Sequence, residues 1–179
     1  MRGPRFIFAG IDPGKSGAIA WTDSLGLELT VGGMPKTERG ILDILGRLAG
    51  HLKLDEDDPA QICRFCLLEH AQSFPGDGHV GAFSYGRNYG SLRSNLGFLE
   101  IPWDTIRPRD WQKEFGPIRN KKHESRPAFK RRLLEQACRL FPKTKISLYA
   151  ADAVLLAELC RRRYAQVSRP EKSFQEVLS

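Results

Sequence analysis

Short apolar runs in the first half of the chain follow the pattern of β-strands. Residues 6–11 are rich in Phe and Ile and end at the turn Asp12-Pro13-Gly14, and two further runs follow after Gly-containing turns. Tight turns of this kind predict an antiparallel meander at the start of a sheet. A mostly apolar run before Glu69 predicts a buried strand, and a shorter run lies further on. The expected strands cover residues 6–11, 17–22, 27–31, 62–68 and 102–106.

Other segments place apolar residues three and four positions apart, which predicts helices. The segment after Glu69 is rich in Gly and aromatic residues and leads into a helix that ends near Leu99. Pro142 ends the next one, because proline cannot continue a helix. The expected helices cover residues 38–53, the stretch up to 99, 127–140 and 150–166, with a helical turn at 111–115. These elements predict one α/β domain over residues 1–167, with a mixed central sheet flanked by helices and a flexible tail at 168–179.

The length of 179 residues is typical of one domain, and no apolar run approaches the roughly 20 residues of a membrane span. The basic and then apolar N-terminus resembles a signal peptide, but it runs into Asp12-Pro13-Gly14 without a cleavage site of small residues. We therefore expect a cytoplasmic protein with no membrane association. Nothing in the sequence indicates an organic cofactor.

The four cysteines do not indicate a disulfide framework. Cys63 and Cys66 lie within the strand expected at 62–68, where residues three apart point to opposite faces, so a shared zinc ion is not expected. Cys138 and Cys160 stand alone in helical patterns. We expect all four to be buried structural thiols. Trp103 and Trp111 are expected in the core.

The chain carries a net charge of +7, which favours a polyanionic partner such as nucleic acid. The charge is uneven, because residues 119–132 hold seven Lys and Arg side chains and a single acid, Glu124. A second basic cluster covers residues 161–163. Such runs are often simply solvated faces of helices, and that alternative stays open for both clusters.

Three carboxylates stand where functional groups collect in α/β proteins. Asp12 follows the first strand and Glu69 follows the buried fourth one, at strand ends. Asp152 lies in the first turn of the last helix, and the residues three, four and seven positions later are all leucine, so it is expected on the apolar face. A buried, unpaired carboxylate costs several kcal/mol. Since no Lys or Arg precedes Asp152 in that helix, a divalent metal shared with the other acids is expected.

Oxygen ligands of this kind suit hard cations. The set therefore predicts Mg²⁺, with Mn²⁺ as a possible substitute, and two ions in the site. A pair of such ions activates water and stabilises both the attacking and the leaving oxygen of a phosphodiester. Each acid also has a purely structural interpretation. Asp12 is then a turn aspartate, Glu69 a solvated residue at a strand end, and Asp152 an acid that complements the helix dipole.

The order of these motifs resembles the RuvC-like Holliday-junction resolvases, most closely their phage and prophage branch. The resemblance covers residues 6 to about 163. It is carried by Ile11-Asp-Pro-Gly14 with Ser16-Gly17, Leu67-Leu-Glu69, Glu69-His-Ala-Gln-Ser-Phe-Pro-Gly76, Phe83-Ser-Tyr-Gly-Arg-Asn-Tyr-Gly90, Ile106-Arg-Pro-Arg-Asp-Trp-Gln112 and Ala150-Ala-Asp-Ala153. It implies an RNase H-like fold and a magnesium-dependent endodeoxyribonuclease that cuts crossover junctions in DNA recombination and repair, with Asp12, Glu69 and Asp152 as catalytic metal ligands.

The chain departs from the resembled pattern at one place. The family has a fourth ligand, Asp or His, three or four residues before the last acid, where this chain has Tyr149 and Leu148. Either His70 or His123 replaces it, or the protein is a catalytically weak or inactive relative that still binds junctions.

The resemblance also implies how DNA is bound. Phe74 matches an aromatic residue that stacks on unpaired bases at the crossover, although a core role is an equal alternative. Basic residues of the 119–132 stretch would hold phosphates, namely Lys121, Lys122, Arg126, Lys130, Arg131 and Arg132. A junction has approximate two-fold symmetry, so one site per chain implies a homodimer, expected to form through residues 83–99.

Three other functions were weighed. An actin-like or hexokinase-like ATPase needs two such domains, and the chain is too short for them. A non-enzymatic junction-binding or RNA-binding module stays open because of the missing fourth ligand. An RNase H that acts on hybrids also stays open, although the motif order favours junctions.

Overall fold

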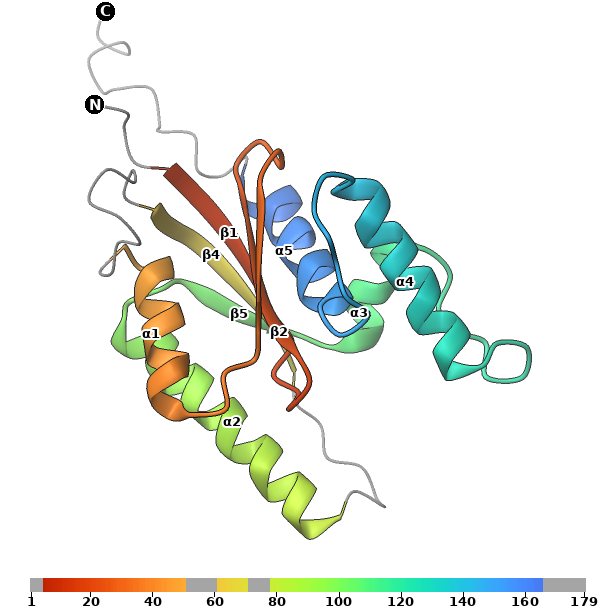
Figure 1. Ribbon diagram of the computed structural model, residues 1–179, viewed down its shortest axis with the longest axis horizontal. Helices are drawn as coiled ribbons and strands as arrows, with labels where there is room; N and C mark the ends of the chain where they lie inside the picture. The colour runs from red at the N-terminus through yellow and green to blue at the C-terminus, as the bar shows by residue number, and fades with distance from the viewer. Residues whose placement is uncertain (1–4, 51–60, 71–77, 166–179) are drawn as a thin grey trace, which may run out of the picture.

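Five strands form a single mixed sheet in the order β3-β2-β1-β4-β5. A computed structural model describes residues 5–50, 61–70 and 78–165 (Figure 1). β1 pairs antiparallel with β2, and β2 antiparallel with β3, whereas β1–β4 and β4–β5 are parallel. The strands are β1 (Arg5–Ile11), β2 (Ala18–Asp23), β3 (Leu29–Gly33), β4 (Gln61–Glu69) and β5 (Trp103–Ile106). The meander and the mixed sheet predicted from the sequence are both confirmed.

Helices cover both faces of this sheet (Figure 1). α1 and α2 pack on one face, and α5 packs on the other with α4 and α3 beside it. The helical elements are α1 (Glu38–Leu48), α2 (His79–Phe98), α3 (Pro108–Gln112), the 3-10 turn η1 (Lys113–Phe115), α4 (Arg126–Leu140) and α5 (Ala151–Tyr164). Among the described residues no helix is both long and apolar enough to cross a membrane.

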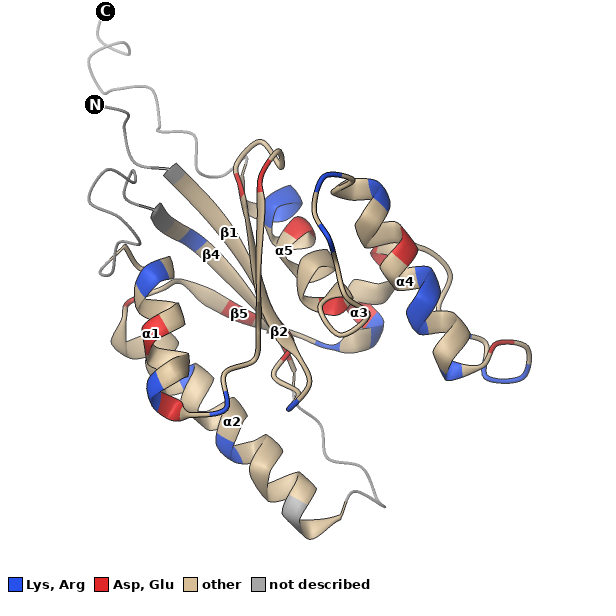
Figure 2. Ribbon diagram, viewed as in Figure 1, with Lys and Arg blue, Asp and Glu red and all other residues tan. Residues whose placement is uncertain are grey.

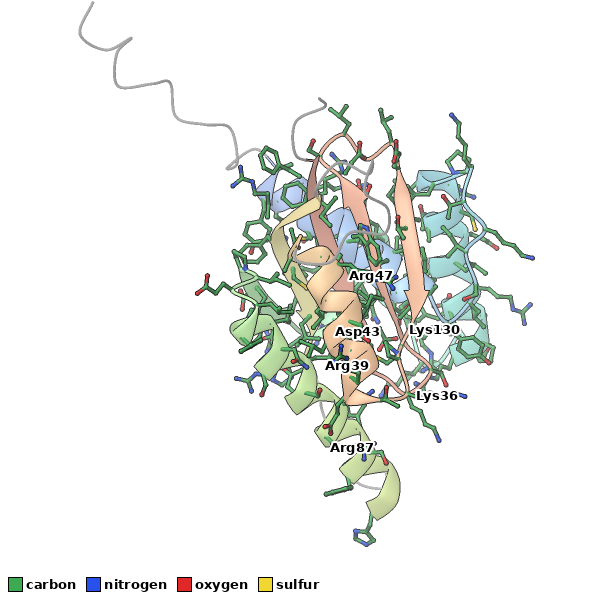
Figure 3. The ribbon with its side chains drawn as sticks, turned by 60° about the vertical axis from the view of Figure 1, so that its left-hand side comes forward. Lys36, Arg39, Asp43, Arg47, Arg87 and Lys130 are labelled. Atoms are coloured by element: carbon green, nitrogen blue, oxygen red, sulfur yellow. The ribbon has the colours of Figure 1, made fainter. Side chains whose placement is uncertain are left out.

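Alternation along β1 divides the core into two layers. Ile7, Ala9 and Ile11 belong to the cluster under α1 and α2, whereas Phe8 belongs to the cluster under α5. α1 shows the matching amphipathic pattern, with Arg39, Asp43 and Arg47 labelled on its charged outer side in Figure 3. The first strand thus presents its even-numbered residues, including Gly10, to α5.

α5 is the central helix, since every residue from Ala151 to Cys160 is buried. It lies so close to β1 that a Cβ on Gly10 would sit 2.2 Å from the backbone nitrogen of Ala157 and 2.4 Å from the carbonyl oxygen of Ala153. Real Cβ atoms do not approach other atoms so closely, so only glycine allows this packing. The contact fixes the height of α5 over the strand that leads to Asp12.

The first helix is shorter than the predicted 38–53. It ends at Leu48, and Gly50 adopts a left-handed φ of 77° while its N–H bonds to the carbonyl of Arg47. A glycine in this conformation is a common helix stop. Residues 51–53 lie outside the described ranges, as do residues 168–179, so the predicted tail stays a prediction.

The cysteine prediction was partly wrong. Ile7 pairs with Cys63 while Phe8 pairs with Phe65, so Arg64 is an extra residue and forms a β-bulge. The bulge resets the alternation and brings Cys63 and Cys66 into the same core layer, not onto opposite faces. Both thiols are buried, and burial raises the pKa of Cys63 to about 12. Cys160 is buried as well, but Cys138 is exposed, contrary to the prediction.

Candidate functional site

Asp12 and Glu69 lie side by side at the ends of two neighbouring strands. β1 and β4 run parallel, and Ile11 pairs with Leu68, so the next residue of each strand is one of the two acids. Parallel strands end at the same edge of a sheet, which is where α/β proteins bind ligands. The Asp12 carboxylate (Oδ1) accepts a hydrogen bond of 3.0 Å from the backbone N–H of Gly14, which fixes its turn.

Asp152 reaches the same edge from α5. It occupies the first turn of that helix and is only 4% exposed. The electrostatic coupling of the three acids shows that they are neighbours, because the charges of Asp12 and Asp152 both raise the pKa of Glu69. The structure therefore brings together the three carboxylates that the sequence selected.

Burial and neighbouring charges raise the pKa of two of these acids, Glu69 and Asp12. Burial is the main cause that raises the pKa of Glu69 to about 8, followed by the charges of Asp12 and Asp152. A hydrogen bond from Trp111 and the charge of Lys130 act in the opposite direction. Burial also raises the pKa of Asp12, opposed first by its hydrogen bond from Gly14. A site that disfavours its own negative charge in this way favours a bound cation.

One cation is already present, and the sequence analysis did not expect it. The Lys130 ammonium forms a salt bridge with Oδ2 of Asp152. Lys130 does not belong to the helix that carries Asp152 but to α4, which packs against α5. The buried acid is thus paired within the protein, and its burial alone does not require a metal.

The donor set still suits a hard divalent cation. Oδ1 of Asp152 is buried and has no hydrogen-bond partner, which leaves one oxygen of a buried carboxylate unsatisfied. Asp12 and Glu69 add carboxylate oxygens beside it, and oxygen ligands suit Mg²⁺ or Mn²⁺. As they stand, however, no three His, Cys, Asp or Glu side chains in the described part of the chain are grouped so that they could hold a metal ion. A cation would have to draw the acids closer together.

Trp111 contributes to the site directly. Its ring is fully buried in α3, as predicted for a core residue, but its indole N–H also donates a hydrogen bond of 2.7 Å to Oε2 of Glu69. Sequence reasoning missed this role. The signal was present in the motif from Ile106 to Gln112, where Pro108 starts a helix directly after β5 and so turns Trp111 back toward the strand ends.

No ligand takes the place of the missing fourth acid at positions 148 and 149. Leu148 is 39% exposed and Tyr149 is 67% exposed, and neither side chain carries a metal-binding group of the expected kind. His70 directly follows Glu69, and its Nδ1 is buried with no hydrogen-bond partner. His123 lies exposed in the loop before α4. Of the two histidines that the sequence proposed as replacements, His70 is the one next to a site carboxylate in the chain.

The predicted DNA-binding residues fall into three groups. Four are exposed at the start of α4 and in the loop before it, namely Lys121, Lys122, Arg126 and Arg131. Figure 2 shows Lys and Arg segments along this loop and α4. Lys130 points into the site, and Arg132 is held by Glu124 and by the carbonyl of Pro117. Phe74 lies outside the described residues.

The arginines of the second basic cluster, residues 161–163, form ion pairs within the chain. Arg161 and Arg162 both bind the buried carboxylate of Glu158, and Arg163 pairs with Glu114. These three arginines therefore bind two acids of the same chain, Glu158 on α5 and Glu114 on η1, so the cluster is no ready phosphate-binding surface.

No protein-family model matches the chain, and no curated protein matches its sequence. Its fold, however, is similar to that of solved structures. It is similar to Thermus thermophilus RuvC in complex with a Holliday junction substrate, with a TM-score of 0.55 and 15% identity over 91% of this chain and 96% of that chain. The separately solved Thermus thermophilus RuvC gives a TM-score of 0.53 at 15% identity, over 90% of this chain and 96% of that one. The chain therefore has the RNase H-like fold of RuvC, as predicted.

Proposed function

We propose that this chain is a metal-dependent endonuclease that binds branched DNA such as Holliday junctions and hydrolyses phosphodiester bonds. The observation that carries the proposal is the meeting of Asp12, Glu69 and Asp152 at one edge of an RNase H-like sheet, from two strands and a helix. The fold shared with a junction-bound RuvC supports DNA as the substrate.

Asp12, Glu69 and Oδ1 of Asp152 would hold Mg²⁺ or Mn²⁺ in this proposal. The bound ion supplies an activated water and neutralises charge on the phosphate. Trp111 orients the Glu69 carboxylate through its N–H, and Lys130 holds the other oxygen of Asp152. Because the Gly14 N–H also binds Asp12, the protein holds one oxygen of each of the three acids before any ligand arrives.

The DNA backbone would lie along the start of α4. Arg126 and Arg131 are exposed on this helix, which also delivers Lys130 to the site, and Lys121 and Lys122 are exposed in the loop before it. Such contacts position the duplex arms and carry little sequence information. The stacking role of Phe74 at the crossover stays part of the proposal.

A homodimer would form through α2. Leu92 and Leu96 of this helix are buried in the monomer core, but Phe83 is 73% exposed and Phe98 is 78% exposed. Two large aromatic side chains in water on one helix are consistent with an uncovered contact surface. A two-fold axis through α2 would give two sites for the two symmetric nicks that resolve a junction.

One alternative has its own support. The Lys130 salt bridge compensates the charge of Asp152 without a metal, and positions 148 and 149 carry neither a carboxylate nor an imidazole. Both features suit a catalytically weak or inactive protein that binds junctions and does not cut them.

Cleavage of four-way junctions, flaps, RNA–DNA hybrids and linear duplex, side by side with Mg²⁺ or Mn²⁺, tests the proposal. We expect nicks in the junction near its crossover. Asp12→Asn is expected to abolish cleavage and to leave junction binding intact or tighter, because it removes one negative charge that faces phosphate. Asp43→Asn is the matched control, since Asp43 makes only an exposed pair with Arg39 on α1. Tight junction binding with no cleavage in either ion would establish the alternative instead.

A further inference from the structure

Lys130 places an ammonium group in the carboxylate site, although a site with two divalent ions does not need one. Its ammonium binds Oδ2 of Asp152, whose side chain is 5% exposed, while the lysine stem remains about one third open to solvent, at 31%. A buried salt bridge of this kind persists only where the geometry keeps both charges compensated. The pair links α4 to α5 at the edge where the strands end.

The charge of Lys130 acts on the whole carboxylate group. It lowers the pKa of Asp12 and of Glu69 as well as binding Asp152 directly. The ammonium therefore binds one acid and is close enough for its charge to act on the other two. A divalent ion in a carboxylate site has the same effect on its ligands.

The charges of the site leave room for one divalent ion. The three carboxylates and the ammonium carry a net charge of −2 when all are ionised, which a single divalent ion balances. A second ion would face Lys130 across the same acids, and like charges at short range repel strongly inside a protein. The contacts of Asp152 also favour a single ion, because Lys130 binds its Oδ2 and leaves only Oδ1 without a partner.

Positions 148 and 149, just before α5, supply neither a carboxylate nor an imidazole for a second ion. Leu148 and Tyr149 precede that helix, and both side chains are exposed. Asp152 would therefore have to bind a second ion with the oxygen that Lys130 already occupies.

We propose that Lys130 is a built-in cation that takes the place of a second divalent ion, so that each chain binds one ion, through Asp12, Glu69 and Oδ1 of Asp152. This inference rests on the proposed nuclease function for its biological meaning but not for its test, which measures ion binding. It replaces the two ions expected from the sequence with one ion and one ammonium group. Lys130 acts here as a positioning residue, through Asp152.

Lys130→Met tests the inference, because methionine keeps a long apolar stem and removes the charge. Arg131→Met is the matched control at the next, exposed position of α4, and Lys130→Arg keeps a positive charge. Mn²⁺ is titrated into each full-length protein by calorimetry, and thermal unfolding is followed in EDTA and in Mn²⁺. We expect one Mn²⁺ per chain for the wild type, Arg131→Met and Lys130→Arg, and two for Lys130→Met. We also expect Mn²⁺ to raise the Tm of Lys130→Met by more than that of the wild type, because only the variant leaves Asp152 without a cation in EDTA.

A wild-type stoichiometry of two overturns the inference, and this result does not depend on whether Lys130→Met folds. Equal stoichiometry and equal Mn²⁺-induced Tm shifts for Lys130→Met and the wild type overturn it as well. A wild type that cuts junctions while it binds two ions refutes the inference and leaves the proposed function. A wild type that binds one ion but cuts no substrate supports the inference and refutes the proposed function. A wild type that binds no Mn²⁺ refutes both.

Discussion

The stability of the metal-free protein is expected to fall as the pH rises from about 5 to 8. Burial and the neighbouring acids raise the pKa of Glu69 to about 8, against an ordinary value of 4.5. The folded state thus holds a proton that the unfolded state releases. For a group whose pKa is raised on folding, the contribution to stability is complete below the unfolded pKa and is lost as the pH rises through the folded one.

The size of this effect follows from the two pKa values. Full linkage gives a contribution of about 4 kcal/mol at pH 5 that is almost gone above pH 8. Because the Glu69 side chain is not completely enclosed, solvent screening reduces the expected loss to roughly 2–4 kcal/mol. For a domain of this size, this corresponds to a fall in Tm of roughly 10 °C. Asp12 adds to it in the same direction, since its pKa is raised too.

Urea unfolding in EDTA at a series of pH values measures the effect, with Glu69→Gln as the control. The glutamine amide oxygen can still accept the Trp111 hydrogen bond, but the side chain no longer titrates. The free energy of unfolding of the wild type should decline more steeply with pH than that of Glu69→Gln. Mg²⁺ should flatten the wild-type curve, because it binds the ionised carboxylates and stabilises the protein most at high pH. Parallel curves for the two proteins in EDTA would show that Glu69 ionises normally and that the site is open to water.

Two further substitutions probe the same framework. Trp111→Phe keeps a buried aromatic ring but removes the N–H that lowers the pKa of Glu69. The pH at which the metal-free protein loses stability should therefore rise by about one unit in the same urea series. An unchanged midpoint would mean that the indole only fills space. Gly10→Ala should destabilise the fold by at least about 3 kcal/mol in urea unfolding, because its Cβ would meet the α5 backbone. Gly33→Ala is its control on an edge strand, where nothing lies within 4 Å of a Cβ, and a similar loss for both variants would contradict the proposed close packing.

The binding surface can be tested through salt and charge. Junction affinity should fall with salt by a slope of roughly −0.9 in log K for each phosphate contacted. Charge reversal of Lys121, Lys122 and Arg131 should weaken binding to all junction sequences alike, whereas reversal of Arg39 and Arg47 on the outer side of α1 should not. Equal losses from both sets would indicate a general effect of net charge and no specific surface. Lys130 and Arg132 are unsuitable for this test, because both hold acids of the fold.

The three acids were predictable because each obeys a simple positional rule. Two follow buried strands, and the third lies on the apolar side of a helix, as its leucine neighbours show. The same rule identifies Lys130, which is followed three, four and seven positions later by Leu133, Leu134 and Ala137. Treating the basic stretch as one surface hid this difference between Lys130 and its neighbours. Helix periodicity, applied residue by residue, would have shown that one lysine of the stretch faces inward.

Other features depend on contacts that a single sequence does not reveal. The bulge at Arg64 follows from how β4 pairs with β1, and strand alternation alone misplaced Cys63 relative to Cys66. The hydrogen bond from Trp111 to Glu69 joins residues 42 positions apart, across the turn from β5 into α3. Local patterns therefore predicted the elements and the acids, while the groups that orient those acids became visible only with the packing.

The burial of α5 bears on when the site comes into being during synthesis. Asp12 directly follows β1 and Asp152 lies in the first turn of α5, so the carboxylates meet only after the ribosome has passed α5. Until then, the sheet face around Phe8 and Gly10 has no cover, and β1 lacks the helix that packs against it. A chain interrupted before α5 carries two of the three acids and an exposed apolar face, which favours aggregation or degradation. An incomplete copy of this protein therefore never carries the full set of three carboxylates.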